Sequence, residues 1–155
     1  MKKLLAIVAC AAALLMLTQC SISRKVMAKA YPIGFTELHN YYVVNTHKVK
    51  KIERKIITSA EEFRNICGEA AVRGTHGPPT PGNFQTQFVL AVILPETNRV
   101  VSMYPESVLE NGNAVIFNYK VDKGEKTSYT MVPFTAIALD RPLEMLSMEF
   151  YFEEK

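Results

Sequence analysis

Two patterns of apolar residues in the second half of the chain predict β-strands with different surroundings. The segment from Phe88 to Leu94 is a run of seven apolar residues closed by Pro95, which is typical of a strand covered on both faces. In residues 115–121 and 146–153 every second residue is apolar, which is typical of a strand with one buried face. We therefore expect one fully covered strand and two half-buried strands.

Other strands are predicted from segments rich in β-branched and aromatic residues. Such segments lie at residues 41–45, 49–58, 99–104 and 128–139. Pro133 interrupts the last segment and predicts a bend or a sheet edge, because proline cannot donate a ladder hydrogen bond. Asn111-Gly112 predicts a tight hairpin just before residue 114, and Asp122–Glu125 predicts a turn.

One helix start is evident at Ser59. Ser59 would cap the helix, and Glu62 would reach back to complete a capping box. The helix is expected near residues 59–67, with Cys67 buried on its apolar face. With one helix, several strands and no repeats, the sequence predicts a mainly β fold, namely a single-domain antiparallel β-sandwich or open barrel with one short α-helix.

Residues 74–83 are expected to form an irregular loop, because three prolines and three glycines exclude regular structure there. This loop, continuing to Phe84, is the best candidate for a partner-binding segment, because its prolines limit the freedom lost when a partner holds it. The candidate contact residues are His76, Pro78, Pro79, Thr80, Pro81 and Asn83. The alternative interpretation is a stiff connection that packs across the sandwich with Phe84 buried.

The first nineteen residues have the layout of a secretory signal peptide. Lys2 and Lys3 precede an unbroken apolar run from Leu4 to Leu17. This run of fourteen residues is shorter than the roughly 20 residues that a membrane-spanning helix needs. A cleaved leader is therefore favoured over a permanent span.

The four residues Leu17-Thr18-Gln19-Cys20 end the apolar run. They resemble the lipobox of bacterial lipoproteins, although that family prefers a small residue where Gln19 stands. The resemblance implies that Cys20 is acylated, and several acyl chains hold a protein on a bilayer far better than one. We therefore expect a leader at 1–19, a tether at 20–40, and one β-rich domain at 41–155. The expected location is the cell envelope, lipid-anchored to a bacterial membrane, with the outer membrane or cell surface preferred to the inner membrane.

The charge balance argues against a nucleic-acid partner. The chain of 155 residues carries a net charge of +3, and without Lys2 and Lys3 it has 16 basic and 15 acidic side chains. Phosphate binding needs clustered positive charge, which this balance does not favour. After lipidation of Cys20, Cys67 is the one thiol beyond the leader, so no internal disulfide is expected.

Three segments in the range 52–152 also suggest a family. They are Ile57–Phe63 with the helix start, Asn83-Phe84 before Phe88–Val92, and Tyr129–Leu139 with Pro133. Their order resembles the C-terminal domain of PrcB-type protease-complex subunits, which are bacterial envelope lipoproteins. Two departures are an Asn at 83, where the family usually has Asp, and residues 98–101, where it has a Gly-Gly-type step. The resemblance implies a non-catalytic accessory role beside another envelope protein, with a protease as the implied partner.

Catalysis, metal binding and cofactor binding are not expected. The alternative is a cysteine-dependent hydrolase, in which Cys67 would need His39, His47 or His76 as a base. No cysteine-protease signature surrounds Cys67, and the cysteine and histidines lack the close pairs of structural zinc sites. The glycines of the loop also lack the Gly-Lys-Ser/Thr step of a phosphate cradle.

A further alternative is a glycan-binding surface module. Such a module would place several exposed aromatic residues on one loop face. The sequence does not locate the candidate tyrosines, which are Tyr31, Tyr41, Tyr42 and Tyr104. It also leaves the oligomeric state open.

Overall fold

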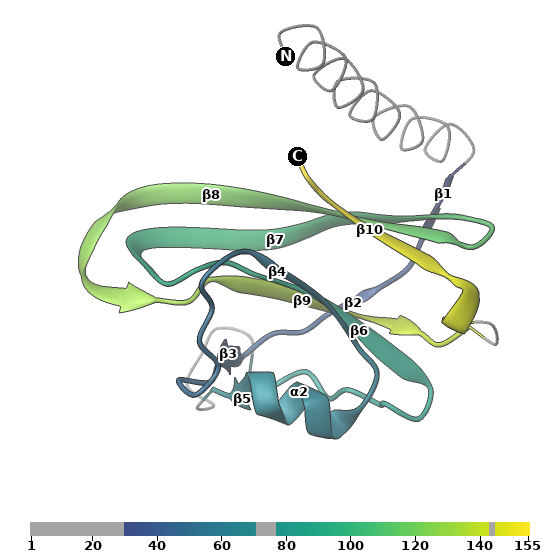
Figure 1. Cartoon of the computed structure of the whole chain (residues 1–155), viewed down its shortest axis with the longest axis horizontal. Helices are drawn as coiled ribbons and strands as arrows, with labels where there is room; N and C mark the ends of the chain where they lie inside the picture. The colour runs from purple at the N-terminus through teal and green to yellow at the C-terminus, as the bar shows by residue number, and fades with distance from the viewer. Residues whose placement is uncertain (1–29, 71–76, 143–144) are drawn as a thin grey trace, which may run out of the picture.

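The computed structural model describes residues 30–70, 77–142 and 145–155. Strands account for 58% of these residues and helices for 8%, so the expected mainly β class is confirmed. The described part contains one α-helix, α2 (Ala60–Ile66), and three sheets (Figure 1). The arrangement is that of a single β-sandwich-like domain carrying one helix.

Two four-stranded sheets form the body of the domain. The upper sheet of Figure 1 consists, in spatial order, of β1 (Tyr31–Ile33), β7 (Thr97–Asn111), β8 (Ala114–Met131) and β10 (Glu149–Glu154). The middle sheet consists of β2 (Thr36–Glu37), β9 (Phe134–Asp140), β6 (Gln87–Ile93) and β4 (Glu53–Ile57). A small sheet pairs β3 (Tyr41–Val43) with β5 (Cys67–Glu69), and a short 3-10 helix, η1 (Met145–Ser147), precedes β10. These pairs are antiparallel except β8 with β10, which is parallel.

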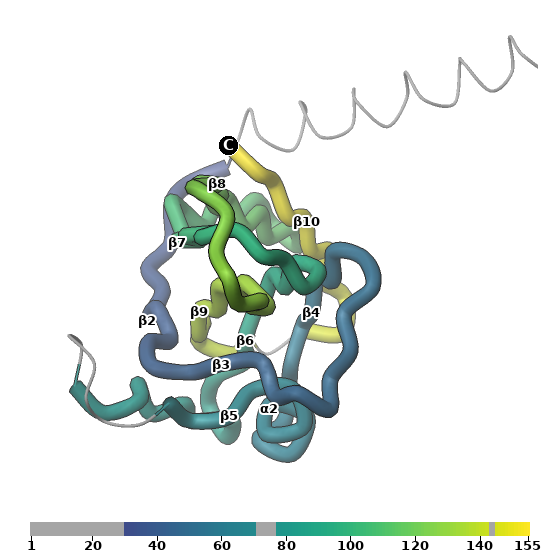
Figure 2. Tube along the Cα trace, turned by 90° about the vertical axis from the view of Figure 1, so that its left-hand side faces the viewer, coloured from purple at the N-terminus to yellow at the C-terminus, as the bar shows by residue number. Residues whose placement is uncertain are grey.

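The middle sheet lies between the upper sheet and a lower layer made of α2 and the small sheet (Figure 2). Alternate residues of β6 face opposite layers. Phe88 and Leu90 pack with the upper sheet, whereas Val89 and Ala91 pack with the lower layer. Every residue from Phe88 to Ile93 is buried, so the prediction of a strand covered on both faces is confirmed.

The core between the upper and middle sheets, called the upper core below, is rich in aromatic rings. Phe88 of β6 contacts Phe150 of β10, with 5.6 Å between ring centroids. Phe117 of β8 contacts Phe152 of β10 at 6.1 Å. Both pairs have a T-shaped geometry, which adds roughly 0.5–1.5 kcal/mol to the burial of each ring. These contacts fasten the half-buried strand that was predicted at the end of the chain, although Leu146 lies exposed in η1.

β7 and β8 form a long hairpin whose turn lies at Gly112, which has a φ of 59°, as Asn111-Gly112 predicts. The prediction of a turn at Asp122–Glu125 is wrong, because β8 runs through this segment without a break. The register shifts opposite it, between Arg99 and Val101 of β7. The turn-forming residues are therefore accommodated as a bulge inside a long strand.

The chain passes from the upper to the middle sheet at Val132-Pro133, between β8 and β9. The segment predicted as one interrupted strand is thus two strands in two sheets, and the bend predicted at Pro133 is confirmed. The Pro133 carbonyl accepts a hydrogen bond from the Leu94 N–H at 2.9 Å. This bond ties the bend to the end of β6.

The folded domain begins before Tyr41. β1 pairs with β7 and β2 pairs with β9, although both strands lie in the segment expected to be a tether. The boundary predicted at residue 41 is therefore corrected to Tyr31 or earlier. The leader and Cys20 lie outside the described residues. Within the described ranges, none of the helices has the length and apolar character needed to cross a bilayer.

Candidate functional site

A cavity of about 590 Å³ lies between α2, β5 and the proline-rich loop. Its size falls within the roughly 300–1,000 Å³ of typical ligand pockets. One wall comes from positions on the same face of the helix, which are Ala60, Phe63 and Arg64. The opposite wall comes from the loop residues Pro81, Gly82 and Phe84. The loop that the sequence singled out thus forms one side of a hollow.

Hydrogen bonds at both ends of α2 hold the helix that forms this wall. The Glu62 N–H donates to Ser59 Oγ at 3.2 Å, which confirms the predicted cap. The Glu62 carboxylate accepts from the Thr58 N–H at 3.4 Å, one residue before the cap. At the other end the Cys67 N–H donates to the Phe63 carbonyl. Cys67 therefore ends the helix and begins β5, which corrects its predicted place on the helix face.

All three residues of β5 line the cavity, whereas Tyr41 is the one residue of β3 that does so. β5 therefore supplies more of the cavity lining than β3 does. Gly68 is the middle residue of β5. A Cβ atom there would lie 2.6 Å from Cζ of the Tyr42 ring, so a larger residue would require the exposed Tyr42 side chain to move.

The start of the described loop is hydrogen-bonded to residues 39–41, at and just before the start of β3. The Thr80 N–H donates to the His39 carbonyl at 3.2 Å, and Thr80 Oγ1 accepts from the His39 N–H at 3.1 Å. The Tyr41 hydroxyl donates to the Thr80 carbonyl at 2.8 Å, and the Asn40 side chain donates to the Gly77 carbonyl at 2.6 Å. Thr80, which was expected to contact a partner, is thus bonded inside the molecule.

The end of the loop is held by Asn83. Its side-chain oxygen accepts from the Gln85 N–H at 3.1 Å. Its carbonyl accepts from the N–H groups of Thr86 and Gln87 at 3.1 and 2.7 Å. Asn83 therefore shapes the turn that leads into β6, while its side chain stays exposed.

Arg141, which follows β9, forms hydrogen bonds with this turn. Its Nη2 donates to the carbonyls of Thr58, Phe84 and Gln87 at 2.7, 3.1 and 3.1 Å. One guanidinium thus joins the end of β4, the cavity wall and the start of β6. Sequence reasoning missed Arg141, because an isolated exposed arginine carries no local signal.

The remaining candidate loop residues differ in exposure. Pro78 and Pro81 are exposed, and Pro79 is half-buried. His76 lies outside the described residues. Pro81 is therefore the predicted contact residue that both faces solvent and lines the cavity.

Three aromatic rings form the apolar part of the cavity. Phe63 contacts Tyr41 edge-on at 5.0 Å and Phe84 at 5.6 Å between ring centroids. Phe84 also packs against the core of the lower layer. The interpretation of Phe84 as a packed residue is therefore correct, and the same ring borders the cavity.

Two opposite charges stand among the lining residues, Arg64 on α2 and Glu69 on β5. Both are exposed, and neither forms an ion pair with another residue of the described ranges. Burial, together with the negative charge of Glu69, raises the pKa of Tyr41. Tyr41 is thus a neutral phenol whose hydroxyl remains bonded to the loop.

The thiol of Cys67 borders the same cavity but is poorly suited to act as a nucleophile. Burial raises the pKa of the Cys67 thiol to about 12, so the thiol is protonated at neutral pH. Of the bases considered for it, His47 bonds to Glu53, and Nε2 of His39 lies 3.8 Å from the Glu37 carboxylate. The third, His76, lies outside the described residues.

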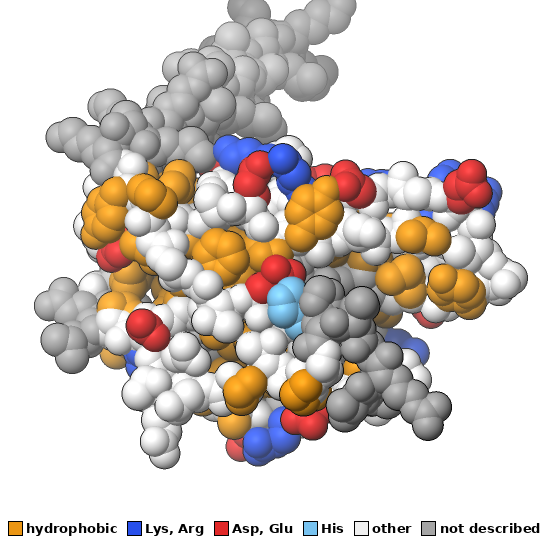
Figure 3. Space-filling view, turned by 180° about the vertical axis from the view of Figure 1, so that it is seen from behind, with side chains coloured by type: hydrophobic (Ala, Val, Ile, Leu, Met, Phe, Trp, Pro, Cys, Tyr) orange, Lys and Arg blue, Asp and Glu red, His pale blue; other side chains and the backbone are white. Residues whose placement is uncertain are grey.

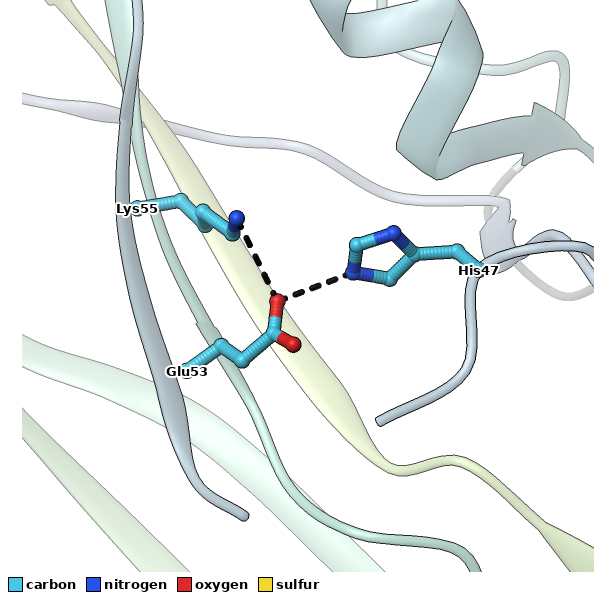
Figure 4. Close-up of polar contacts among 3 residues, drawn as sticks. All are labelled: His47, Glu53 and Lys55. Carbon is cyan, nitrogen blue, oxygen red and sulfur yellow. Dashed lines mark hydrogen bonds and ion pairs between the residues drawn. The ribbon is translucent and has the colours of Figure 1, made fainter. Parts of the chain in front are cut away.

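A second group of titratable side chains lies on the edge strand β4. Oε2 of Glu53 lies 2.9 Å from Nε2 of His47 and 3.4 Å from Nζ of Lys55 (Figure 4). Burial by itself would raise the pKa of Glu53, but the hydrogen bond with His47 and the charge of Lys55 outweigh it and lower that pKa. The group ties the segment before β4 to that strand, and its residues do not line the cavity.

The exposed tyrosines lie on separate strands. Tyr31 is on β1, Tyr42 on β3 and Tyr104 on β7. On the face in Figure 3, hydrophobic side chains are spread over several places and do not form one aromatic cluster. Val100 of β7 and Tyr129 of β8 are also exposed. Within the described ranges, no group of three or more His, Cys, Asp or Glu side chains could hold a metal ion.

Comparisons with protein-family models, with curated proteins and with solved structures found no match to this chain.

Proposed function

We propose that this protein is a lipid-anchored, non-catalytic accessory protein of the bacterial cell envelope, and that it binds another envelope protein at the cavity beside the proline-rich loop. The observation that carries this proposal is the cavity of about 590 Å³, whose wall includes the exposed residues Pro81 and Gly82. The cavity and its lining carry the proposal, because a β-sandwich-like fold by itself serves many functions.

The chemistry of the cavity suits a protein partner. Aromatic rings with a nearby arginine are the side chains most enriched at the energetic centres of interfaces, and the cavity offers Tyr41, Phe63, Phe84 and Arg64. The loop is also held in place before binding, through the bonds of Thr80 and Asn83. A preformed wall reduces the conformational entropy lost on association.

The support for a lipid anchor comes from the first twenty residues of the sequence. The apolar leader ends at Cys20, and the motif around Cys20 resembles a lipobox. The stretch from Cys20 to Tyr31 spans at most about 40 Å when fully extended. An anchored domain would therefore meet partners that are themselves at or near the membrane. The likeness of residues 52–152 to PrcB-type subunits makes an envelope protease the first partner to test.

Photo-crosslinking in native membranes tests the binding site. A photoreactive phenylalanine analogue at Pro81 is expected to capture one membrane protein reproducibly. The matched control is the same analogue at Asn113, an exposed position in the β7–β8 turn. Equal capture from both positions, or none from Pro81, would contradict the proposal.

Fractionation of cells tests the anchor. Cys20→Ser is expected to release the protein from membranes or to leave the precursor unprocessed. Cys67→Ser, a matched change of the other mature cysteine, should leave processing and membrane retention unaffected. Normal processing and retention of the Cys20→Ser variant would refute the lipid anchor.

A further inference from the structure

One edge of β5 carries backbone groups that pair with no strand of the described residues. The Val44 N–H donates to the Ile66 carbonyl at 2.9 Å, and the Ala70 N–H donates to the Asn40 carbonyl at 2.8 Å. These bonds identify the hydrogen-bonded pairs at the two ends of the β3–β5 ladder. Because such pairs occur at every second residue of an antiparallel ladder, Gly68 is the residue of β5 that bonds to β3.

The backbone groups of Cys67 and Glu69 therefore point away from β3. The Cys67 N–H is already bonded to the Phe63 carbonyl. The Cys67 carbonyl and both backbone groups of Glu69 have no hydrogen-bond partner among the described residues. Both residues also line the cavity, so the unpaired edge belongs to the segment that borders it. An unpaired strand edge of this kind is a template for an added strand.

The other walls of the cavity suit the side chains of such a strand. Tyr41, Phe63 and Phe84 present apolar rings beside the edge. Arg64 and Glu69 present one positive and one negative charge. A segment paired with β5 would point alternate side chains toward the rings, because the side chains of a strand alternate between its faces.

The β5 edge differs from the long open edges of the β7–β8 ribbon. That ribbon carries Pro105, the exposed Lys123 and Lys126, and register shifts at three places. Proline, lysine and bulges are among the features that hinder edge-to-edge pairing. The sequence of β5 is Cys-Gly-Glu, and its pairing with β3 has an unbroken register.

We propose that the ligand of the cavity is an extended peptide segment of the partner, which adds to β5 as a third strand of the small sheet and places an apolar side chain against Phe63 and Phe84. This inference rests on the proposed function and specifies the kind of element that is recognised. The Glu69 N–H and the Cys67 carbonyl are the main-chain groups that pair with the segment.

The probes are capped hexapeptides in which phenylalanine or valine alternates with threonine, titrated into the mature protein and followed by amide NMR spectra. We expect shifts at Gly68, Glu69 and Gly82, and protection of the Glu69 amide from hydrogen exchange. Glu69→Pro removes that N–H, which β3 does not use, and is expected to weaken binding at least tenfold. The matched variant Glu69→Ala keeps the N–H and should bind within about threefold of the wild type, since rim charges contribute little.

A second comparison does not depend on the folding of the proline variant. The same hexapeptides, N-methylated at the amides that would face β5, should lose binding to the wild-type protein, whereas methylation of the alternate amides should not. Filling the cavity by Ala60→Phe should also block binding, unlike Glu61→Phe on the outer side of the helix. The proposal would be overturned by any one of three results. These are equal binding of the two methylated forms, amide NMR shifts confined to strands other than β5, and no binding at millimolar peptide concentration.

These outcomes separate the inference from the proposed function. If crosslinking at Pro81 still captures a membrane protein while no peptide binds at β5, the accessory role stands and strand addition is refuted. If peptides bind as described while Pro81 captures nothing, the strand site stands and the envelope partner is refuted.

Discussion

The two faces of the middle sheet are built from the same strands but are covered very differently. One face meets a four-stranded sheet, and the Phe150 ring of that sheet contacts Phe88 of the middle sheet. The other face meets a helix of seven residues and two strands of three residues each. The smaller cover leaves a cavity of about 590 Å³ beside it. The upper face is thus the more fully packed one, whereas the smaller cover of the lower face leaves room for the candidate site.

The largest expected effect is the loss of a buried ring from the upper core. Phe88→Ala should lower the free energy of unfolding by about 3–5 kcal/mol, because Phe88 is 1% exposed and its removal leaves a void. Phe63→Ala should cost less, about 2–3 kcal/mol, because its ring already borders a cavity. Urea denaturation of both variants checks this order. An equal or larger loss at Phe63 would mean that the lower layer is as tightly packed as the upper one.

The next largest expected effect is a loss of stability at the end of the proline-rich loop. Arg141→Gln should lower the free energy of unfolding by about 1–2 kcal/mol, because three carbonyls lose a charged donor. The loss should be local, with faster hydrogen exchange at the Thr86 and Gln87 amides and unchanged exchange in β8. Arg141→Lys keeps the charge but lacks the planar guanidinium. Its free energy of unfolding should lie between those of the wild type and Arg141→Gln. Uniformly faster exchange throughout the domain would disprove a local role.

Removing one tyrosine hydroxyl on each side of the middle sheet should change the free energy of unfolding in opposite directions. The Tyr119 hydroxyl is buried in the upper core without a hydrogen-bond partner in the described structure, so Tyr119→Phe should raise the free energy of unfolding by about 1 kcal/mol. Tyr41→Phe loses the bond to Thr80 and should lower it by about 1 kcal/mol. Thermal and urea unfolding provide the measurement. The same sign for both variants would contradict this contrast.

The smallest effect concerns acid stability at the edge of the middle sheet. Because the pKa of Glu53 is lower in the folded protein, its ionised form stabilises the fold above the ordinary pKa of about 4.5, and this contribution disappears as the pH falls through the folded value. Glu53→Gln should therefore lower stability at pH 7 by less than about 1 kcal/mol and have little effect at pH 3. Glu125→Gln, at an exposed position on β8, is the control and should show no such difference. A larger effect at pH 3 than at pH 7 would reverse the assigned sign.

Sequence patterns predicted the elements whose surroundings are uniform along their length. The run from Phe88 to Leu94 identified the strand buried on both faces, and Ser59 with Glu62 identified the helix start, because both signals are local. Asn118 alternates with the apolar residues of the 115–121 segment, yet it is 2% exposed and its Nδ2 donates to Ser107 Oγ at 2.9 Å. That bond depends on the register of β7 with β8, which no single segment specifies.

The candidate site was predicted only in part, for the same reason. Prolines marked the loop, but β5 was missed because Cys-Gly-Glu has no strand propensity and forms a strand through its pairing with β3. The turn expected at Asp122–Glu125 is absent, because pairing with β7 keeps this segment extended and β8 accommodates the turn-forming residues as a bulge. Local composition therefore located the loop, while the walls opposite it arise from contacts between distant segments.

The irregular register of the β7–β8 ribbon has a consequence for the behaviour of this protein at high concentration. Beyond the residues that pair with β1 and β10, both strands of the ribbon expose backbone groups over many residues. A flat ribbon of this length would be a seed for stacking copies of the chain into fibrils. Pro105 and the exposed Lys123 and Lys126 interrupt such stacking at three positions. The bends and charges of the ribbon thus disfavour the stacking of copies of this chain at high concentration.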